Sequence, residues 1–554
     1  MTAPVHRWGD ASTYYMQMQS ISNDFDIQYQ SKDINRVFEN KLDDIPSGMY
    51  LIKNEEGNYY YGKEFSYALF AAPFYKLLGN NGILFFNGLM LLIMILMGYL
   101  YLRDENGDKV ALGVSVSYFI LSTAFVYIFW ITAEIYNMFL IMASLFFWER
   151  YFKNNNSKYL FIASFIFGLA FIAKLPNIFI FLPLLFYELY KKRFNNFFIM
   201  LLIFLIPVIA IYGYFFLNTG SISFYGGNRL YYLQNFPFVN GYDSINEAGE
   251  PAFSVSQDDR MDALISRDDI KVIPYNLFYY IFGKCAGMFW YYPFTLFALF
   301  SVFTTYSHYS RLSLRSKTRS NTNISYVSSN ADKILILAGI ILYIVFFCAV
   351  IGINYLGGQH GLGNRYFYVY PAFIFLIQKI ELKKAITVIF ISILTLNPII
   401  LDPIGNSISP FKHETSFPYP HFPIEYTQLD NLPFWNYSQT IDDFTVYRLD
   451  DESKYSGDAF IVNGSTDMMI RSENKIETLI LSLSSKNAKI DASINFGNTK
   501  QPLKVNNDNV KAVILKVEGI KPVYMNKRYC IYTMSISSPD ELNVTLKNES
   551  SINT

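Results

Sequence analysis

Residues 83–102, ILFFNGLMLLIMILMGYLYL, form an apolar stretch without a single charged side chain. An α-helix needs about 20 mostly apolar residues to cross the hydrocarbon part of a bilayer. Further apolar stretches follow along the chain at 110–129, 136–149, 158–173, 176–190, 196–217, 286–306, 334–352, 366–378 and 385–401. The sequence therefore predicts a polytopic α-helical membrane protein with about ten spans.

The composition of the 554-residue chain agrees with this prediction. Hydrophobic residues make up 52% and charged residues only 16%, whereas about a quarter of a typical soluble chain is charged. The 45 Lys and Arg balance 45 Asp and Glu, so the basic excess of a nucleic-acid-binding protein is absent. Three widely spaced Cys exclude a disulfide scaffold and a cysteine zinc site.

Basic residues gather in alternate loops, which predicts the orientation. Loops rich in Lys and Arg stay in the cytoplasm, and the following residues mark them: Arg103, Lys109, Arg150, Lys153, Lys158, Lys191, Lys192, Arg193, Arg311, Arg315, Lys317, Arg319, Lys379, Lys383 and Lys384. The other loops have only Lys174 and Arg365 near their membrane ends. We therefore expect a plasma membrane protein with the following segments outside the cell: 1–82, 130–135, 218–285, 353–365 and 402–554.

The N-terminal segment 1–82 is expected outside although no apolar stretch precedes it to drive export. We therefore expect a first transmembrane helix to be missing before Met1, which would bring the number of spans to about eleven. Residues 65–79 are short for a span and are predicted to form an interfacial helix on the outer leaflet. The alternative is that they cross the membrane and reverse part of the topology.

From about residue 431 the pattern changes to short alternating runs such as IETLILSLS and KIDASINF, separated by turn residues. Such alternation predicts strands, and roughly seven or eight of them at this spacing predict a β-sandwich. The domains are thus an outer loop (1–82), a transmembrane domain (83–401) with an outer loop at 218–285, a linker (402–430) and an extracytoplasmic sandwich (431–554). The sandwich would bind carbohydrate or serve a structural or protein-contact role.

Two carboxylates at the outer membrane edge are candidates for catalysis, because charge beside a bilayer is costly and often functional. Asp10 precedes an amphipathic stretch and could deprotonate a hydroxyl as a general base; the alternative is a helix cap. Glu134 lies between two spans on the same side. It could orient a partner, hold a metal or assist as a base, and the alternative is a favourable charge at a helix start.

Three cations on the same side are candidates for binding a phosphate. Lys63 begins the predicted interfacial helix, Lys284 lies among aromatic residues and glycines, and Arg365 follows a glycine-rich loop. Arg clasps phosphate bidentately, although snorkelling to lipid headgroups explains such residues without a ligand. His360 is a candidate proton carrier or metal ligand, but a lone loop histidine is more often neither. The sequence has no HExxH, P-loop or dinucleotide motif.

Carboxylates from two loops and cations from three others suit transfer of a sugar from a lipid phosphate. A carboxylate would deprotonate the acceptor hydroxyl, and the cations would stabilise charge on the leaving phosphate. We expect a polyprenyl-phosphate sugar as donor, membrane lipid as surroundings, a protein, glycan or lipid as acceptor, and no certain cofactor, with a divalent metal left open. The alternatives are a transporter or flippase of a glycolipid and a non-catalytic assembly partner.

Four segments resemble bacterial GT-C glycosyltransferases, the dolichyl-phosphate-mannose–protein mannosyltransferase-like class. GDASTYY with NDFDIQY resembles the first outer loop of that family, and YYGKEFSYALFAAPFY resembles its interfacial helix. FGKCAGMFWYYPF and GLGNRYFYVYPAF resemble later recurring segments. The likeness extends over about residues 8–400 and leaves the C-terminal strands outside.

The resemblance implies a membrane enzyme that transfers a hexose or pentose with inversion. It places the catalytic carboxylate at Asp10 and a second acidic position at Glu134. Lys63 is the nearest match to a lysine that contacts the lipid phosphate in similar lipid A aminoarabinose transferases, and Arg365 is added by analogy. Asp10 stands alone, where eukaryotic mannosyltransferases have an adjacent Asp-Glu pair, so the acceptor class stays open.

Overall fold

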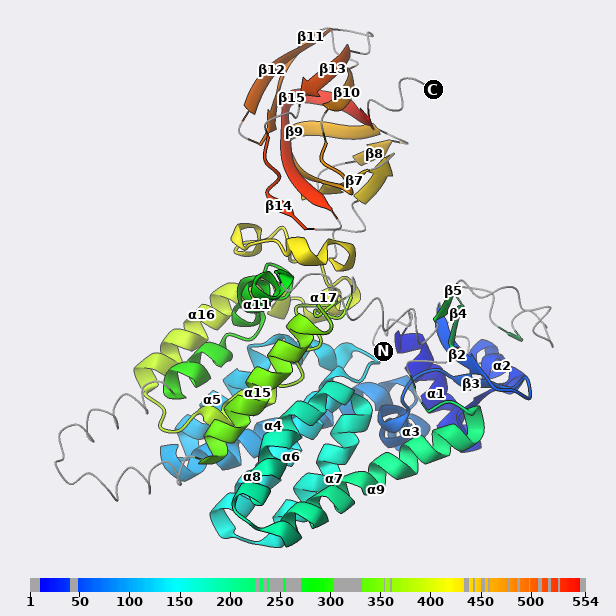
Figure 1. The fold of residues 1–554 in the computed structure, drawn as a ribbon, viewed down its shortest axis with the longest axis vertical. Coiled ribbons are helices and arrows are strands. Elements are labelled where there is room, and N and C mark those ends of the chain that lie inside the picture. Colours follow the sequence, from blue (N-terminus) through cyan, green and yellow to red (C-terminus); the bar gives the residue numbers. More distant parts are fainter. Residues whose placement is uncertain are drawn as a thin grey trace, which may run out of the picture.

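The computed structural model describes a helical region and a β-rich C-terminal region (Figure 1). The described residues are 10–39, 48–222, 224, 229–232, 237–238, 253–255, 271–302, 331–352, 354–358, 361–432, 438–441, 444–449, 454–456, 459–476, 478–485, 489–497, 499–506, 511–516, 520–526 and 529–548.

The helical region contains these elements in chain order: α1 (Asp10–Asp24), α2 (Ser31–Glu39), α3 (Ser66–Leu78), α4 (Asn80–Asn106), α5 (Asp108–Ile120), η1 (Thr123–Phe129), α6 (Glu134–Asn154), α7 (Ser157–Ala173), η2 (Leu175–Asn177), α8 (Ile178–Tyr190), α9 (Phe194–Thr219), α11 (Val272–Phe282), α12 (Met288–Tyr291), α15 (Ala331–Ala349), η4 (Tyr370–Leu376), α16 (Leu382–Ile400), α17 (Pro403–Ile408), η5 (Tyr419–His421) and η6 (Tyr426–Asn431).

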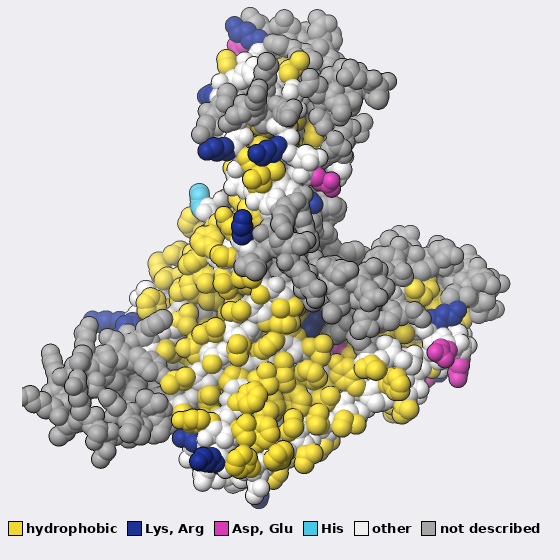
Figure 2. Space-filling view, in the orientation of Figure 1, with side chains coloured by type: hydrophobic (Ala, Val, Ile, Leu, Met, Phe, Trp, Pro, Cys, Tyr) yellow, Lys and Arg dark blue, Asp and Glu magenta, His cyan; other side chains and the backbone are white. Residues whose placement is uncertain are grey.

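Several of these helices have the length and composition of membrane spans. In the described part of the chain, α4, α9, α15 and α16 each qualify, and α5 with η1 adds a fifth if this pair, bent by 62°, is one span. Three shorter apolar helices accompany them: α7, η2 with α8, and α11. Hydrophobic side chains cover much of the outside of this region (Figure 2), including the exposed Leu92 and Ile209. The chain is a membrane protein by this measure, and the number of ten or eleven spans stays a prediction.

Besides 110–129, which is divided between α5 and η1, two further predicted spans are not continuous helices. Residues 366–378 contain only the 3-10 helix η4, and the stretch 286–306 begins as the four-residue α12 and breaks before a second helix starts at 294. Pro371 and Pro293 lie at these breaks. Proline has no N–H to donate and its ring clashes with the preceding helical turn, which explains the interruptions.

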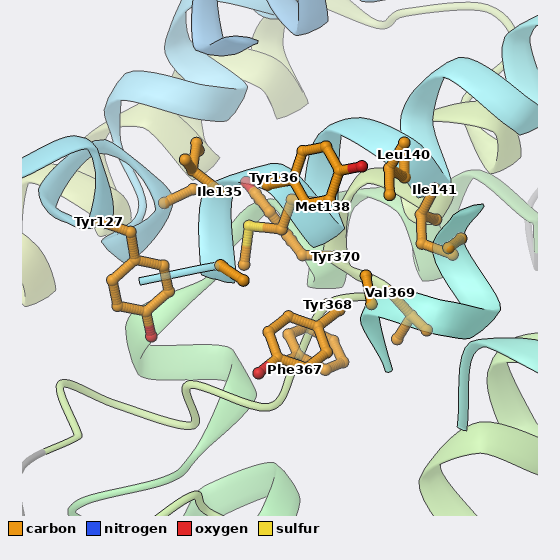
Figure 3. Packing of buried hydrophobic residues seen from close by; sticks show 14 of the residues in the cluster. Tyr127, Ile135, Tyr136, Met138, Leu140, Ile141, Phe367, Tyr368, Val369 and Tyr370 are labelled. Atoms are coloured by element: carbon orange, nitrogen blue, oxygen red, sulfur yellow. The ribbon is translucent and has the colours of Figure 1, made fainter. Parts of the chain in front are cut away.

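The segment 361–378 contains no α-helix and is mostly buried, so its carbonyl groups need partners other than water. Buried tyrosine hydroxyls supply them by donating hydrogen bonds from Tyr127 to Leu362 (2.6 Å), Tyr343 to Tyr366 (2.5 Å), Tyr118 to Tyr370 (2.6 Å) and Tyr101 to Phe375 (2.7 Å). Figure 3 shows Phe367 and Tyr368 beside Tyr127 and the first turns of α6. This packing gives one reason for the many tyrosines of the chain and fixes the loop that carries Arg365.

A small antiparallel sheet lies beside α1, α2 and α3 (Figure 1). Its strands have the order β1 (Gln28–Tyr29), β3 (Tyr59–Tyr61), β2 (Met49–Lys53), β4 (Arg229–Tyr232) and β5 (Phe253–Val255). The sheet joins the N-terminal loop to the loop after α9, because β2 pairs with both β3 and β4. The predicted helix at 65–79 is present as α3 and follows this sheet directly.

The C-terminal region contains β6 (Ser438–Ile441), β7 (Phe444–Arg448), β8 (Lys454–Ser456), β9 (Ala459–Ser472), β10 (Thr478–Ser484), β11 (Lys489–Phe496), β12 (Thr499–Asn506), β13 (Lys511–Lys516), β14 (Tyr524–Met525) and β15 (Cys530–Asn548). The prediction of a β-rich region from about 431 is confirmed.

The described residues form ten strands in one hydrogen-bonded network, more than the seven or eight predicted, and the sandwich arrangement stays a prediction. The long strand β15 connects its parts, since it pairs with β9 along most of its length and with β11 and β10 in turn on its other edge. Apolar side chains such as Ile470, Leu481 and Ile536 fill the interior. The region rests on the linker, where the hydroxyl of Tyr529 donates to the carbonyl of Tyr426 at 2.8 Å.

Candidate active site

Asp10 is the first residue of α1 and contacts two cations. Its Oδ1 lies 2.6 Å from Nζ of Lys63, and its Oδ2 lies 3.3 Å from Nη2 of Arg365. The remainder of α1 is buried almost to its end, so the helix holds Asp10 in place. The side chain of Asp10 is still 25% exposed, which leaves it accessible to a substrate.

Lys63 reaches Asp10 from the end of β3. Gly62 precedes it and packs so tightly on the neighbouring strand that an added Cβ would lie 3.3 Å from the carbonyl of Tyr50. The Nζ of Lys63 lies 4.9 Å from the centre of the Tyr50 ring, and the side chain of Gln17 donates to the Lys63 carbonyl at 3.2 Å. The lysine is therefore buried and held between α1 and the small sheet.

Arg365 connects Asp10 to Glu134. Its Nε lies 3.9 Å from Oε1 of Glu134, and Glu134 is a buried residue at the N-terminus of α6, where a helix favours negative charge. Gly357, with φ of +100°, leaves room for the arginine, because an added Cβ would come within 2.4 Å of its Cγ. The structure thus brings together Asp10, Lys63, Glu134 and Arg365 from four separate segments.

Two further cations belong to this cluster and were not among the residues selected from sequence. Lys174 acts electrostatically on Asp10, and its Nζ lies 4.8 Å from the centre of the Tyr366 ring. The buried Arg229 of β4 lies with its guanidinium carbon 3.8 Å from the centre of the Tyr50 ring. Lys174 had a signal in the sequence as one of two cations near the outer membrane ends, whereas Arg229 had none.

Electrostatics keep the Asp10 carboxylate ionised. Burial alone would raise the pKa of Asp10, but Lys63, Arg365 and Lys174 outweigh it and lower this pKa well below its usual value. Burial lowers the pKa of Lys63 to about 7 against the opposing charge of Asp10. Burial also raises the pKa of the neighbouring Glu64 to about 7. Four basic side chains thus lie close to three carboxylates. The pKa values of Lys63 and Glu64 both lie near neutrality, and an anion bound here would favour the charged form of Lys63.

Lys284 has its neighbours in a second buried polar group. Its backbone N–H donates to the carbonyl of Pro423 at 2.8 Å, and its own carbonyl accepts the hydroxyl of Tyr291 at 2.8 Å. Burial and the charge of Lys284 together lower the pKa of His413 to about 3. The predicted phosphate contact therefore lies among linker residues, and the other candidate, His360, lies outside the described residues.

Glu425 is the centre of this second group. Its Oε1 accepts hydrogen bonds from the backbone N–H groups of Cys285 and Ala286, both at 2.7 Å. Gly283 gives the carboxylate room, since an added Cβ would lie 2.2 Å from Oε1. We refer to Glu425 and these three residues as the Glu425 clamp, which fixes the loop after α11 to the linker.

No group of three or more His, Cys, Asp or Glu within the described ranges could hold a metal ion. What the Asp10 cluster offers chemically is an ionised, accessible carboxylate surrounded by cations. Such a site can bind an anion and accept a proton from a hydroxyl placed beside it.

One protein-family model matches part of this chain. Residues 65–214 match the model of the family described as dolichyl-phosphate-mannose-protein mannosyltransferase, which supports the resemblance to GT-C enzymes. The matched part runs from α3 into α9 and includes Glu134 and Lys174, while Asp10, Lys63 and Arg365 lie outside it. A search of curated proteins gave no match.

Proposed function

From the match to the dolichyl-phosphate-mannose-protein mannosyltransferase family, we propose that this chain is a membrane glycosyltransferase that uses a polyprenyl-phosphate sugar. It transfers the sugar to an acceptor hydroxyl on the extracytoplasmic side of the plasma membrane. The observation that carries the proposal is the contact of one accessible carboxylate, Asp10, with two cations, the buried Lys63 and the partly buried Arg365.

The cations provide the place for the donor phosphate. Lys63 and Arg365 carry the charges closest to Asp10, and Lys174 and Arg229 add positive charge around them. A phosphate binds such groups by charge-assisted hydrogen bonds. In the free enzyme Asp10 occupies these donors, so an arriving phosphate takes over the contacts of the carboxylate. The pKa of Asp10 then rises, and the carboxylate becomes a stronger base when the donor is present.

The reaction follows as a single displacement. Asp10 accepts the proton of the acceptor hydroxyl, and the acceptor oxygen forms a bond with the anomeric carbon of the sugar. The bond between that carbon and the phosphate oxygen breaks, and its electron pair leaves with the polyprenyl phosphate. Lys63 and Arg365 stabilise the negative charge that develops there, while Glu134 holds Arg365 in position. Attack opposite to the leaving group inverts the anomeric configuration.

The apolar surface next to the site suits a lipid carrier. Helix α3 begins three residues after Lys63 and exposes Leu69, Phe70, Leu77 and Leu78. A polyprenyl chain could lie along such a surface while its phosphate reaches the cations. The distribution of basic loops supports an outward-facing site, and the same orientation would put the C-terminal strands outside the cell.

A transfer assay tests the proposal. The purified full-length chain in lipid nanodiscs is incubated with a panel of radiolabelled polyprenyl-phosphate sugars and with hydroxyl acceptors of the protein, glycan and lipid classes. We expect transfer from at least one lipid-linked donor and none from nucleotide sugars. Movement of a glycolipid between leaflets of sealed vesicles, without any transfer, would contradict the proposal and favour a flippase.

A further inference from the structure

A cavity lies on the small sheet, and its lining does not include the residues of the Asp10 cluster. It has a volume of about 520 Å³ and is lined by residues of β1, the start of α2, the end of β2 and the turn into β3. Ligand pockets commonly have volumes of about 300–1,000 Å³. Strand β1 forms the edge of the sheet, so the cavity opens beside an edge that lacks a neighbouring strand among the described residues.

Aromatic rings form the apolar part of this cavity. The hydroxyl of Tyr29 donates to the carbonyl of Pro237 at 2.6 Å and so anchors the adjacent Phe238. The ring of Phe238 then lies 5.8 Å from that of Tyr29 and 6.4 Å from that of Tyr59, centre to centre. The Phe238 ring is tilted by 44° to that of Tyr29 and stands at 89° to that of Tyr59. The two buried tyrosines thus support the partly exposed Phe238, whose ring offers an apolar face on which a sugar ring can stack.

The polar part of the lining offers amides and one uncompensated cation. Among the hydrogen bonds of the described residues, none uses the side-chain amide of Gln28 or Gln30, so both can serve sugar hydroxyls. Lys32 has its charge compensated by Asp24 and Asp26 at 3.4 and 3.7 Å. No ion pair of the described residues includes Lys53, and none of the described lining residues is Asp or Glu.

The position of the cavity relates it to the reacting site. Tyr59 lines the cavity and Lys63 follows it by four residues, a separation of at most about 13 Å along an extended chain. The cavity is therefore close enough to the reacting site for one oligosaccharide to extend from it to Asp10. The donor needs the apolar surface of the helices for its lipid, whereas this cavity is lined by amides and tyrosines and thus suits the acceptor.

We infer that this cavity binds a non-reacting sugar residue of the acceptor, which is therefore an oligosaccharide with an anionic substituent that faces Lys53. The inference rests on the proposed function, because it assigns the substrate class of the same enzyme. Contacts with remote parts of a substrate lower the barrier at the reacting centre when their binding energy orients the substrate there.

Direct binding tests the inference without requiring transfer. The full-length chain in nanodiscs is applied to an array of trisaccharides that carry uronic acid or phosphate groups and to their neutral counterparts. We expect the acidic members to bind and the neutral ones to bind about tenfold more weakly, as for loss of a charge-assisted contact. Lys53→Gln should weaken acidic binding about tenfold by the same argument, and Phe238→Ala should weaken all binding through lost stacking.

Lys500→Gln on the exposed face of β12 is the matched control and should leave binding unchanged. Asp10→Asn should also retain trisaccharide binding, so normal transfer by this variant together with retained binding would reject only the base assignment. The inference is overturned if no trisaccharide binds, if neutral and acidic members bind equally, or if Lys53→Gln and Phe238→Ala bind like the wild type.

Discussion

Asp10 and Glu425 are two carboxylates of the helical region that are held in different ways. Asp10 is partly exposed and is bound by the side chains of Lys63 and Arg365. Glu425 is fully buried and is bound by backbone N–H groups in the Glu425 clamp. Side-chain cations can turn to another anion, whereas backbone amides cannot leave without local unfolding. The comparison indicates that the first arrangement suits exchange of partners and the second suits mechanical support.

The largest expected effect separates these two roles. Asp10→Asn removes the proposed base and should reduce transfer by about a thousandfold or more, within the range of general-base catalysis, while membrane insertion remains intact. Glu425→Gln keeps an acceptor oxygen for both N–H groups and should retain transfer. Initial rates in nanodiscs measure both variants. Normal transfer by Asp10→Asn would remove the base assignment.

The cations should show the next largest effect. Lys63→Gln and Arg365→Gln each remove a charge-assisted contact to the phosphate, and each should lower kcat/KM for the donor about tenfold to a hundredfold. Lys284→Gln removes a cation of the second polar group and should change donor kcat/KM by less than about threefold. An equally large loss of donor kcat/KM in Lys284→Gln would assign this lysine to the phosphate site and contradict the distinction between the two polar groups.

The smallest expected effect concerns the stability that the Glu425 clamp contributes. Glu425→Ala leaves two buried N–H groups without an acceptor, each at a cost of about 1–3 kcal/mol, and should lower the apparent Tm in nanodiscs. Glu425→Gln should lower it less. A Tm for Glu425→Ala equal to that of Glu425→Gln would show that the clamp contributes no stability.

The pKa of Glu425 predicts that the stability of the protein depends on pH. Burial raises the pKa of Glu425 from 4.5 to about 7. Between these values the folded protein holds a proton that the unfolded chain has released, so this carboxyl lowers stability as the pH rises through that window. The Tm of the wild type should therefore fall more than that of Glu425→Gln between about pH 4 and about pH 8, which lie on either side of this window. Parallel Tm curves would contradict the assignment.

The sequence predicts the positions of the apolar helices well, but it does not predict how the buried segments between them are arranged. Continuous apolar stretches identify α4, α9, α15 and α16, because length and hydropathy decide whether a helix can cross a bilayer. The segment 366–378 looks equally apolar, yet it is not a continuous helix, since its carbonyl partners are tyrosine hydroxyls such as that of Tyr118, 252 positions away. Pro371 marks the interruption locally, but no local pattern identifies these distant hydrogen-bond partners.

The candidate site shows the same limit. Asp10, Lys63, Glu134 and Arg365 could be selected because each lies at the predicted outer end of a span or in a predicted outer loop, and the fold then brings them together. Lys284 met the same criterion and lies in another group, because Pro423 and Glu425 of the linker surround its loop. Arg229 enters the site through the pairing of β4 with β2, a contact between distant segments that no spacing along the chain reveals.

The affinity of Asp10→Asn for the donor tests the central claim most directly. Asp10 occupies Lys63 and Arg365 in the free enzyme, so its removal frees both cations for the phosphate. Titration of nanodisc-embedded protein with the polyprenyl-phosphate sugar should show that Asp10→Asn binds the donor at least as tightly as the wild type while transfer is lost. Weaker donor binding by this variant would show that Asp10 holds the donor or the fold, and would contradict its role as the base.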